Sequence, residues 1–413
     1  MWDTIGMLPI TAHPAIMKKY GTHFQTLFTK PSYEHFLNYV TGLITVEHPT
    51  IAGIAAHIYQ GKDQSSLNRF FTKTDWDVSN LNEERLALLQ QNQKTAWKQK
   101  GVICIDDTFS QKSGQSMEGA GWYKDHAGNK GYVFAHNFIY SHYADNQVQY
   151  PLDFHLYVKE NDIEDQDLLR AFQDKIQLAQ KLVDQAERRK TAAQTYVFDS
   201  WYFCRELTDH IETYQKDWIS VSKLNRIVLW NGNKVILKDF VMQTIPWESY
   251  KRLEVNGKIF WYFSKSVTLK SQGKVRIVAT FEERDNERTK EPTVLVTNRK
   301  DWNAKKIIET YAMRWSIETF FRDGKQSLGF EDYQLRSIKA VERHLCLVNV
   351  AYSLLELERI ESRLLTKVHN QLQTIGKTAK NVANDLLRSL VLWVYEQTKK
   401  TKNPELAYQM LLT

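Results

Sequence analysis

Two short apolar runs, each ended by an acidic residue, constrain the fold of this chain most strongly. Val102 to Ile105 is followed at once by Asp106, and Tyr196 to Phe198 is followed by Asp199. Such a run is typical of a central strand where it emerges at the carboxyl edge of a sheet, which is the usual place for a site. An acid at a strand end can also be the N-cap of the next helix. Two such strands together favour a sheet edge that carries two carboxylates.

The segments around these strands predict a mixed α/β fold. Runs at 132–143 and 148–158 are rich in aromatic and β-branched residues and predict a hairpin. A long helix is expected from about 164 to 189, and a shorter one from about 204 to 214 precedes a strand at 218–221. The predicted order is therefore strand, strand, strand, helix, strand, helix, strand.

A predicted helix further along the chain supplies a third carboxylate. On one continuous helix, Tyr311, Arg314, Glu318 and Lys325 would fall within roughly 60° of one another. A carboxylate suits a hard divalent metal, and cations and a phenol suit phosphate oxygens. The alternative is an ordinary amphipathic helix with an ion pair between residues four apart. The order Asp, Asp, Glu along the chain favours a joint site.

The spacing Tyr-x2-Arg-x3-Glu-x6-Lys resembles the YREK signature of prokaryotic insertion-sequence transposases, which are DNA cut-and-paste enzymes of the DDE class. The predicted strand order also resembles their ribonuclease-H-like core, with the first acid on the first strand and the second on the fourth. The resemblance implies that Asp106, Asp199 and Glu318 are both catalytic residues and metal ligands. They would hold two Mg²⁺ ions about 4 Å apart, and Mn²⁺ would substitute for Mg²⁺ because hard oxygen ligands select these ions over zinc.

The same resemblance implies the reaction and the residues that bind DNA. The site would hydrolyse a phosphodiester at the transposon end and then join the freed 3′-hydroxyl to target DNA. Tyr311, Arg314 and Lys325 would clamp phosphates beside the scissile bond. Trp315 and Trp201 are candidate stacking partners for a base.

The first metal ligand is ambiguous because Asp106 and Asp107 are adjacent. Neighbouring strand residues point to opposite faces, so only one of the two can readily face the metals. Asp106 is preferred because the first-strand motif of the family resembles Asp-x-Thr, and Thr108 stands at the third position here.

The chain divides into four predicted regions. An all-helical DNA-binding region covers 1–95, and the catalytic core covers 96–225 and 300–335. Between the second Asp and the Glu, strand-like runs alternate with Gly and Asn turns over 226–299. YREK-type transposases carry a β insertion at this point, although a small independent β domain would give the same pattern. A C-terminal helical region covers 336–413.

The N-terminal region contains a possible helix-turn-helix. Two short helices are predicted at 49–58 and 64–71, with Asp63 as the N-cap of the second. This arrangement would place Arg69 on a recognition helix, together with Ser65, Ser66 and Asn68. Any helical hairpin with a Gly turn gives the same pattern, so a purely structural role stays open.

Composition narrows the class of partner. Among 413 residues, Lys and Arg number 55 and Asp and Glu number 48, which gives a net charge of +7. A basic chain favours a polyanionic partner. The resemblance implies that this partner is double-stranded DNA, in the form of transposon terminal inverted repeats and target DNA. The three cysteines lack Cys-x2-Cys spacing, which argues against a zinc ribbon or a disulfide framework. A bacterial cytoplasmic, nucleoid-associated protein is expected.

Other classes are disfavoured. No apolar run approaches the roughly 18 residues of a membrane span. The sequence also lacks the Gly-x4-Gly-Lys motif that would indicate a nucleotide cofactor. A homodimer on paired ends is expected, with apolar helical faces at 340–360 and 386–396 as candidates for its interface. Two rivals remain: a catalytically inactive, transposase-derived DNA-binding protein, and a glycosidase that uses a carboxylate pair. The glycosidase would not need cations on the Glu face.

Overall fold

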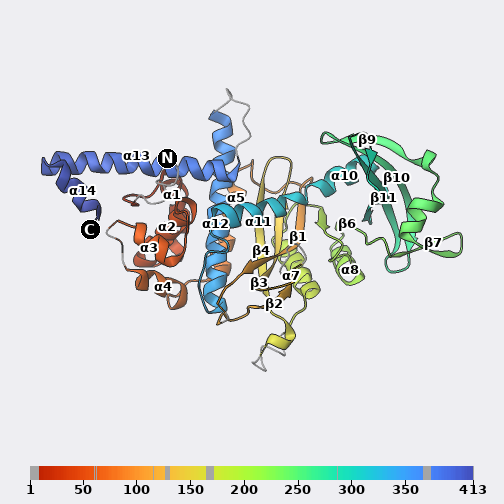
Figure 1. Ribbon diagram of the computed structural model, residues 1–413, viewed down its shortest axis with the longest axis horizontal. Coiled ribbons are helices and arrows are strands. Elements are labelled where there is room, and N and C mark those ends of the chain that lie inside the picture. The colour runs from red at the N-terminus through yellow and green to blue at the C-terminus, as the bar shows by residue number, and fades with distance from the viewer. Residues whose placement is uncertain are drawn as a thin grey trace. The chain divides into compact units, whose positions relative to one another are not determined.

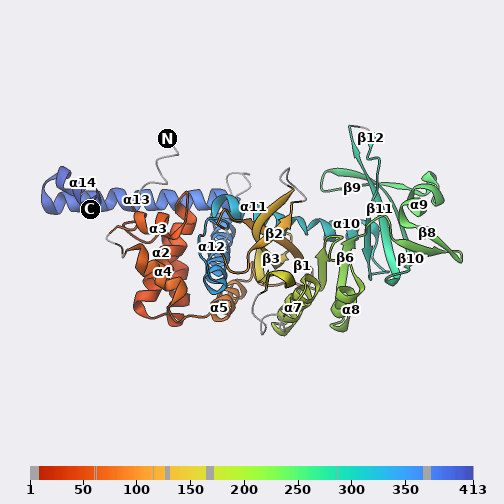
Figure 2. The ribbon, with the colours of Figure 1, turned by 60° about the horizontal axis from the view of Figure 1, so that its bottom comes forward.

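The computed structural model (Figures 1 and 2) describes residues 9–59, 61, 63–114, 116–125, 131–163, 172–285, 287–365 and 374–412. The chain forms two compact units. The helical unit consists of Met1–Ala96, Phe109–Asn137 and Thr319–Thr413, and the sheet unit consists of Trp97–Thr108 and Phe138–Glu318. No helix among the described residues is long and apolar enough to cross a membrane.

Parallel strands form the centre of the sheet. β1 (Val102–Gln111), β5 (Thr195–Phe198) and β6 (Asp217–Val221) are neighbours, and β5 runs parallel to both of the others. On the other side of β1 lies β3 (Tyr132–Ala144), which pairs with β4 (Gln149–Tyr157). The order of these strands in the sheet is β4-β3-β1-β5-β6. The mixed α/β fold is confirmed and is consistent with a ribonuclease-H-like core.

Helices also follow β4 and β5 in this core. α7 (Lys175–Arg188) packs on β4 and on α8 (Arg205–Thr213), and its buried face is made of Leu178, Ala179, Leu182, Val183 and Ala186. The predicted helix at 204–214 is confirmed. Of the predicted helix at 164–189, residues 164–171 lie outside the described residues, and α7 begins only after Asp174. The Asp174 side chain accepts from Gln177 N at 2.8 Å, and this N-cap defines the start of the helix.

The predicted β insertion continues the core sheet. Its main strands are β7 (Ile227–Trp230), β8 (Asn233–Ile236), β9 (Lys251–Val255), β10 (Lys258–Leu269), β11 (Gly273–Arg284), β12 (Glu287–Arg288) and β13 (Thr293–Thr297). The predicted Asn-Gly turns join β7 to β8 and β9 to β10, and Asn231 and Asn256 have φ of 49° and 51°. Because β13 pairs antiparallel with β6, one hydrogen-bonded sheet runs from the core into the insertion.

The predicted continuous helix through Glu318 is wrong. The chain forms α10 (Ala304–Ala312) and α11 (Trp315–Ser327), with a turn at Met313 and Arg314. Arg314 N donates to Tyr311 O at 2.9 Å and Ser316 N donates to Met313 O at 3.0 Å. These bonds between residues i and i+3 replace the α-helical pattern. Cys104 Sγ of β1 lies 3.7 Å from Met313 O, so the turn also makes a tertiary contact.

The helical unit combines both ends of the chain. Its N-terminal helices are α1 (Ala15–Tyr20), α2 (Lys30–Thr45), α3 (Ile51–His57), α4 (Gln64–Thr72) and α5 (Val78–Gln91). Its C-terminal helices are α12 (Ile338–Leu365), α13 (Ile375–Thr401) and α14 (Pro404–Leu412). The short strand β2 (Gly121–Lys124) pairs with the start of β3 within the same unit.

Helix α12 holds this unit together. It packs against α2, α4 and α5, and both views show the N-terminal helices beside it (Figures 1 and 2). Buried polar contacts fix the packing: Tyr39 Oη lies 2.8 Å from His344 Nδ1, and Arg343 Nη1 donates to Phe71 O at 3.0 Å. Arg85 Nη1 donates to Ser353 Oγ at 2.8 Å. The N-terminal helices therefore share one core with α12.

Candidate active site

Asp106 and Asp199 lie at the same edge of the sheet. Ile105 of β1 pairs with Phe198 of β5 in parallel register, and each aspartate is the next residue along its strand. Parallel neighbours bring their carboxyl ends to one edge, so the two carboxylates face a common region. The fold therefore brings together the first two predicted site residues.

Arg314 joins the first aspartate to the glutamate. Its Nη1 donates to Asp106 Oδ2 at 2.9 Å, and its Nη2 donates to Glu318 Oε1. The turn between α10 and α11 carries this arginine, and the glutamate is in the first turn of α11. Only 15% of the Arg314 side chain is exposed, so the guanidinium is a largely buried bridge between two acids.

Negative charge accumulates around Asp106. Burial, together with the charges of Asp199 and Asp107, raises the pKa of Asp106 to about 7, although Arg314 lowers it. A buried carboxylate next to other carboxylates is stabilised by a nearby cation. The local electrostatics therefore favour binding of a positive ion at this edge.

Arg314 also has a donor that is not used by the acids. Its Nε is buried and has no hydrogen-bond partner among the described residues. The ring of Tyr311 lies 5.7 Å from the guanidinium carbon, and burial raises the pKa of Tyr311 to about 12, so the phenol keeps its proton. A phosphate oxygen is a suitable acceptor for both groups.

Asp107 makes a different set of contacts. It accepts from Lys175 Nζ at 2.8 Å and from Tyr202 Oη at 3.0 Å. Burial, together with the charge of Asp107, raises the pKa of Tyr202. This aspartate therefore ties β1 to the start of α7 and to the segment after Asp199, which supports the choice of Asp106 as the first ligand.

Lys175 and Tyr202 were missed in the sequence. The N-cap pattern of Asp174 and Gln177 indicates that a helix starts at Lys175, but no local signal shows which acid the lysine contacts. Lys175 Nζ also lies 5.2 Å from the ring of Trp201, whose side chain is half exposed. Both candidate stacking residues are exposed to solvent: Trp201 is 49% exposed and Trp315 is 62% exposed.

Lys325 is not part of the Arg314 contacts. It belongs to the helical unit, where its Nζ donates to Phe109 O at 2.6 Å and forms an ion pair with Glu331 at 2.9 Å. It follows Glu318 on α11 by seven residues, close to two helical turns, so both side chains leave the helix in similar directions.

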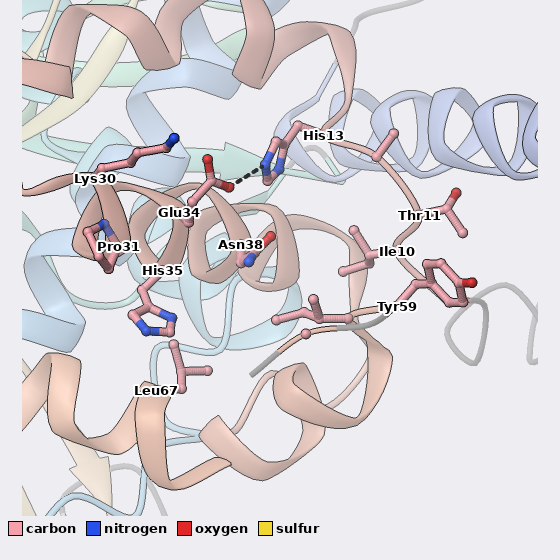
Figure 3. A pocket seen from close by; sticks show the side chains of 13 residues that line it. Ile10, Thr11, His13, Lys30, Pro31, Glu34, His35, Asn38, Tyr59 and Leu67 are labelled. Atoms are coloured by element: carbon pink, nitrogen blue, oxygen red, sulfur yellow. Dashed lines mark hydrogen bonds and ion pairs between the residues drawn. The ribbon is translucent and has the colours of Figure 1, made fainter. Parts of the chain in front are cut away.

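Arg69 is exposed on α4, and its Nη1 donates to Ser65 Oγ at 2.9 Å. The predicted N-cap is confirmed, because Asp63 Oδ1 accepts from Ser66 N at 2.9 Å. A groove of about 470 Å³ in the same region is lined by Leu67 of α4 and by an ion pair of His13 and Glu34 (Figure 3). Part of α4 thus faces this groove, while Arg69 stays accessible.

Comparison with known proteins agrees with this geometry. Residues 23–238, just over half of the chain, match the family described as DDE superfamily endonuclease. The chain therefore belongs to the DDE superfamily endonucleases. The matched region contains Asp106 and Asp199 and ends before Arg314 and Glu318. No curated protein matches the chain.

Endonucleases of this superfamily generally use divalent metals, and the donors at this edge fit such ions. Asp199 Oδ1 accepts from Trp201 N at 2.8 Å, whereas its Oδ2 has no hydrogen-bond partner among the described residues. Carboxylate oxygens suit Mg²⁺ and Mn²⁺. Within the part of the chain that the structure describes, no three His, Cys, Asp or Glu side chains converge as a metal site, and Glu318 instead contacts Arg314. Asp106 and Asp199 could hold a metal, and Glu318 could join them once released by Arg314.

We expect Asp106→Asn to weaken Mn²⁺ binding by at least about tenfold, because it removes a ligand charge. Asp107→Asn should change the affinity by less than about threefold, because Asp107 contacts Lys175 and Tyr202 instead. Isothermal titration of the full-length protein with Mn²⁺ measures both. The opposite ranking of the two variants would show that Asp107 is the ligand.

Proposed function

We propose that this chain is a prokaryotic cut-and-paste DNA transposase of the YREK type. The main support is the contact of Arg314 with both Asp106 and Glu318, because the arginine of the signature then touches two of the three proposed acids. Membership of the DDE superfamily endonucleases and the ribonuclease-H-like strand order support the same reaction class. The reaction is phosphodiester cleavage at transposon ends, followed by joining of the 3′-hydroxyls to target DNA.

The metal ions and the side chains around them would have different roles in this reaction. Two Mg²⁺ ions held by Asp106, Asp199 and Glu318 would supply an activated oxygen nucleophile and charge neutralisation. Arg314 binds a phosphate oxygen beside the scissile bond through Nε and through the donor that now contacts Glu318. The protonated phenol of Tyr311 donates to the same phosphate. These donors orient the DNA strand before the bond is cut.

Further residues of the chain bind DNA. Arg69 is exposed on α4 and contacts the transposon terminal repeat, while Lys325 contacts a backbone phosphate. Trp201 and Trp315 present exposed aromatic rings on which an unpaired base can stack. The net charge of +7 favours association with both the terminal repeats and target DNA.

Asp106→Asn, Asp199→Asn and Glu318→Gln should each reduce Mg²⁺-dependent nicking of supercoiled plasmid by at least about 100-fold, because each removes a metal-ligand charge. Their affinity for duplex DNA should stay within about threefold of wild type, because phosphate contacts elsewhere supply most of it. Gel analysis of plasmid topology and fluorescence anisotropy measure the two quantities.

Asp107→Asn is the matched control and should keep most of its nicking activity. Wild-type protein that binds DNA but never cuts it, with either Mg²⁺ or Mn²⁺, would favour the inactive DNA-binding derivative. Cleavage that persists in Glu318→Gln would rule out the assigned third ligand.

The active species is a homodimer that pairs two transposon ends, because both ends must be cut and joined together. Exposed apolar side chains on the last two helices support this. Val391, Leu392 and Tyr395 of α13 are 55–64% exposed, and Leu406 and Tyr408 of α14 are 43% and 55% exposed. Apolar residues gathered on neighbouring helices are typical of a contact with a second copy of a chain.

Leu392→Asp combined with Tyr395→Asp should leave binding to one DNA end unchanged and abolish complexes that contain two ends, because charges are introduced into an apolar contact. Mass photometry with short duplexes that carry the end sequence measures the two species. Paired complexes formed equally well by the double variant would place the interface elsewhere.

A further inference from the structure

A polar cavity lies at the end of β1, within the helical unit. Its volume is about 540 Å³, which is in the size range of ligand pockets. Residues 111–114, 116, 117, 331–334 and 336 form most of its wall, and Thr50 completes it. Gln111 is the last residue of β1, the strand that also carries Asp106.

Lys112 is held at the wall of the cavity without a carboxylate contact. Its Nζ donates to the carbonyl oxygens of Glu331 and Tyr333, at 2.7 and 3.3 Å, and lies 3.3 Å from the centre of the Tyr333 ring. Burial lowers the pKa of Lys112 to about 7, so its charged form lacks a full counter-charge. An anion in the cavity would stabilise that ammonium.

The surroundings of Lys112 are rigid. Tyr333 Oη lies 2.8 Å from His136 Nδ1, and His136 Nε2 lies 3.0 Å from Glu118 O. Burial lowers the pKa of His136 to about 4, so the ring is neutral near neutral pH and adds no charge of its own. The lysine is thus held in a preformed position.

Arg336 supplies a second cation. It is exposed and has no side-chain hydrogen bond or ion pair among the described residues. The hydroxyls of Ser113 and Ser116 line the same cavity and are exposed as well. A guanidinium with nearby hydroxyls is suited to the oxygens of a phosphodiester.

Two acids restrict what the anion can be. Glu331 is paired with Lys325 at 2.9 Å, while Asp332 lines the cavity without a side-chain ion pair among the described residues. A free phosphate dianion would be repelled by Asp332. A phosphodiester carries one negative charge, and the base attached to it can donate an amino hydrogen to a carboxylate, as cytosine N4 does.

We propose that this cavity binds one deoxynucleotide of the DNA that the protein holds, with its phosphate on Lys112 and Arg336 and its base edge on Asp332. This inference rests on the proposed function, because it takes DNA as the substrate. It adds a site that reads a base of the bound DNA. The site is separate from the phosphate clamp at Arg314.

Arg336→Gln should weaken binding of a fluorescein-labelled duplex of randomised sequence by about tenfold. The number of counterions released on binding, which is read from the salt dependence of the affinity, should fall by about one. Lys399→Gln is the matched control, since it removes one exposed charge from α13, and it should change the affinity by less than about twofold. Fluorescence anisotropy of the full-length protein between 50 and 200 mM KCl, roughly the range over which phosphate contacts are resolved, measures both.

Asp332→Asn tests the base contact. An asparagine side chain suits adenine, so the base selected at one position from the randomised pool should shift from cytosine toward adenine. An unchanged base preference, or equal affinity of Arg336→Gln and the control, would overturn the inference.

Wild-type cleavage of plasmid separates this inference from the proposed function. If the protein cuts DNA and Arg336→Gln behaves like the control, only the nucleotide site is lost. If the protein never cuts DNA but both variants show the expected changes, the site stands and the transposase proposal fails. Absence of any DNA binding would overturn both.

Discussion

The ion pairs of Arg314 with Asp106 and Glu318 are the contacts on which the rest of the site depends. Two parallel strands place Asp106 and Asp199 at one edge of the sheet, and burial makes the negative charge of Asp106 costly. Arg314 offsets part of that cost while no other cation is present. A guanidinium in this position can give up one acid to a metal and bind a phosphate in exchange, because its donors suit both partners.

The broken helix explains how Arg314 reaches both acids. A residue within a regular helix would be confined to one face, whereas the turn at Met313 and Arg314 lets the side chain extend from the start of α11. Cys104 and Ser316 pack beside this turn, with Cys104 Sγ 3.5 Å from Ser316 Oγ. The position of the arginine therefore depends on the packing of β1 against the turn as well as on local sequence.

The sequence predicted the features that are encoded locally. Apolar runs ended by acids indicated β1 and β5, and Asn231 and Asn256 marked the turns of the insertion, because these residues tolerate a left-handed backbone. Features that depend on tertiary contacts were not predictable. One such feature is the break before α11. Two others join segments that are distant in the chain: the contact of Lys175 with Asp107 and the pairing of β13 with β6. The catalytic roles of Asp106, Asp199 and Glu318 stay predictions.

Anomalous scattering from Mn²⁺ in crystals of the full-length protein with duplex DNA tests the central claim most directly. The account predicts a peak within about 2.2 Å of carboxylate oxygens of both Asp106 and Asp199, with Arg314 moved from Glu318 to a phosphate oxygen. A peak at Asp107, or a fully intact contact of Arg314 with Glu318 beside bound DNA and metal, would contradict it.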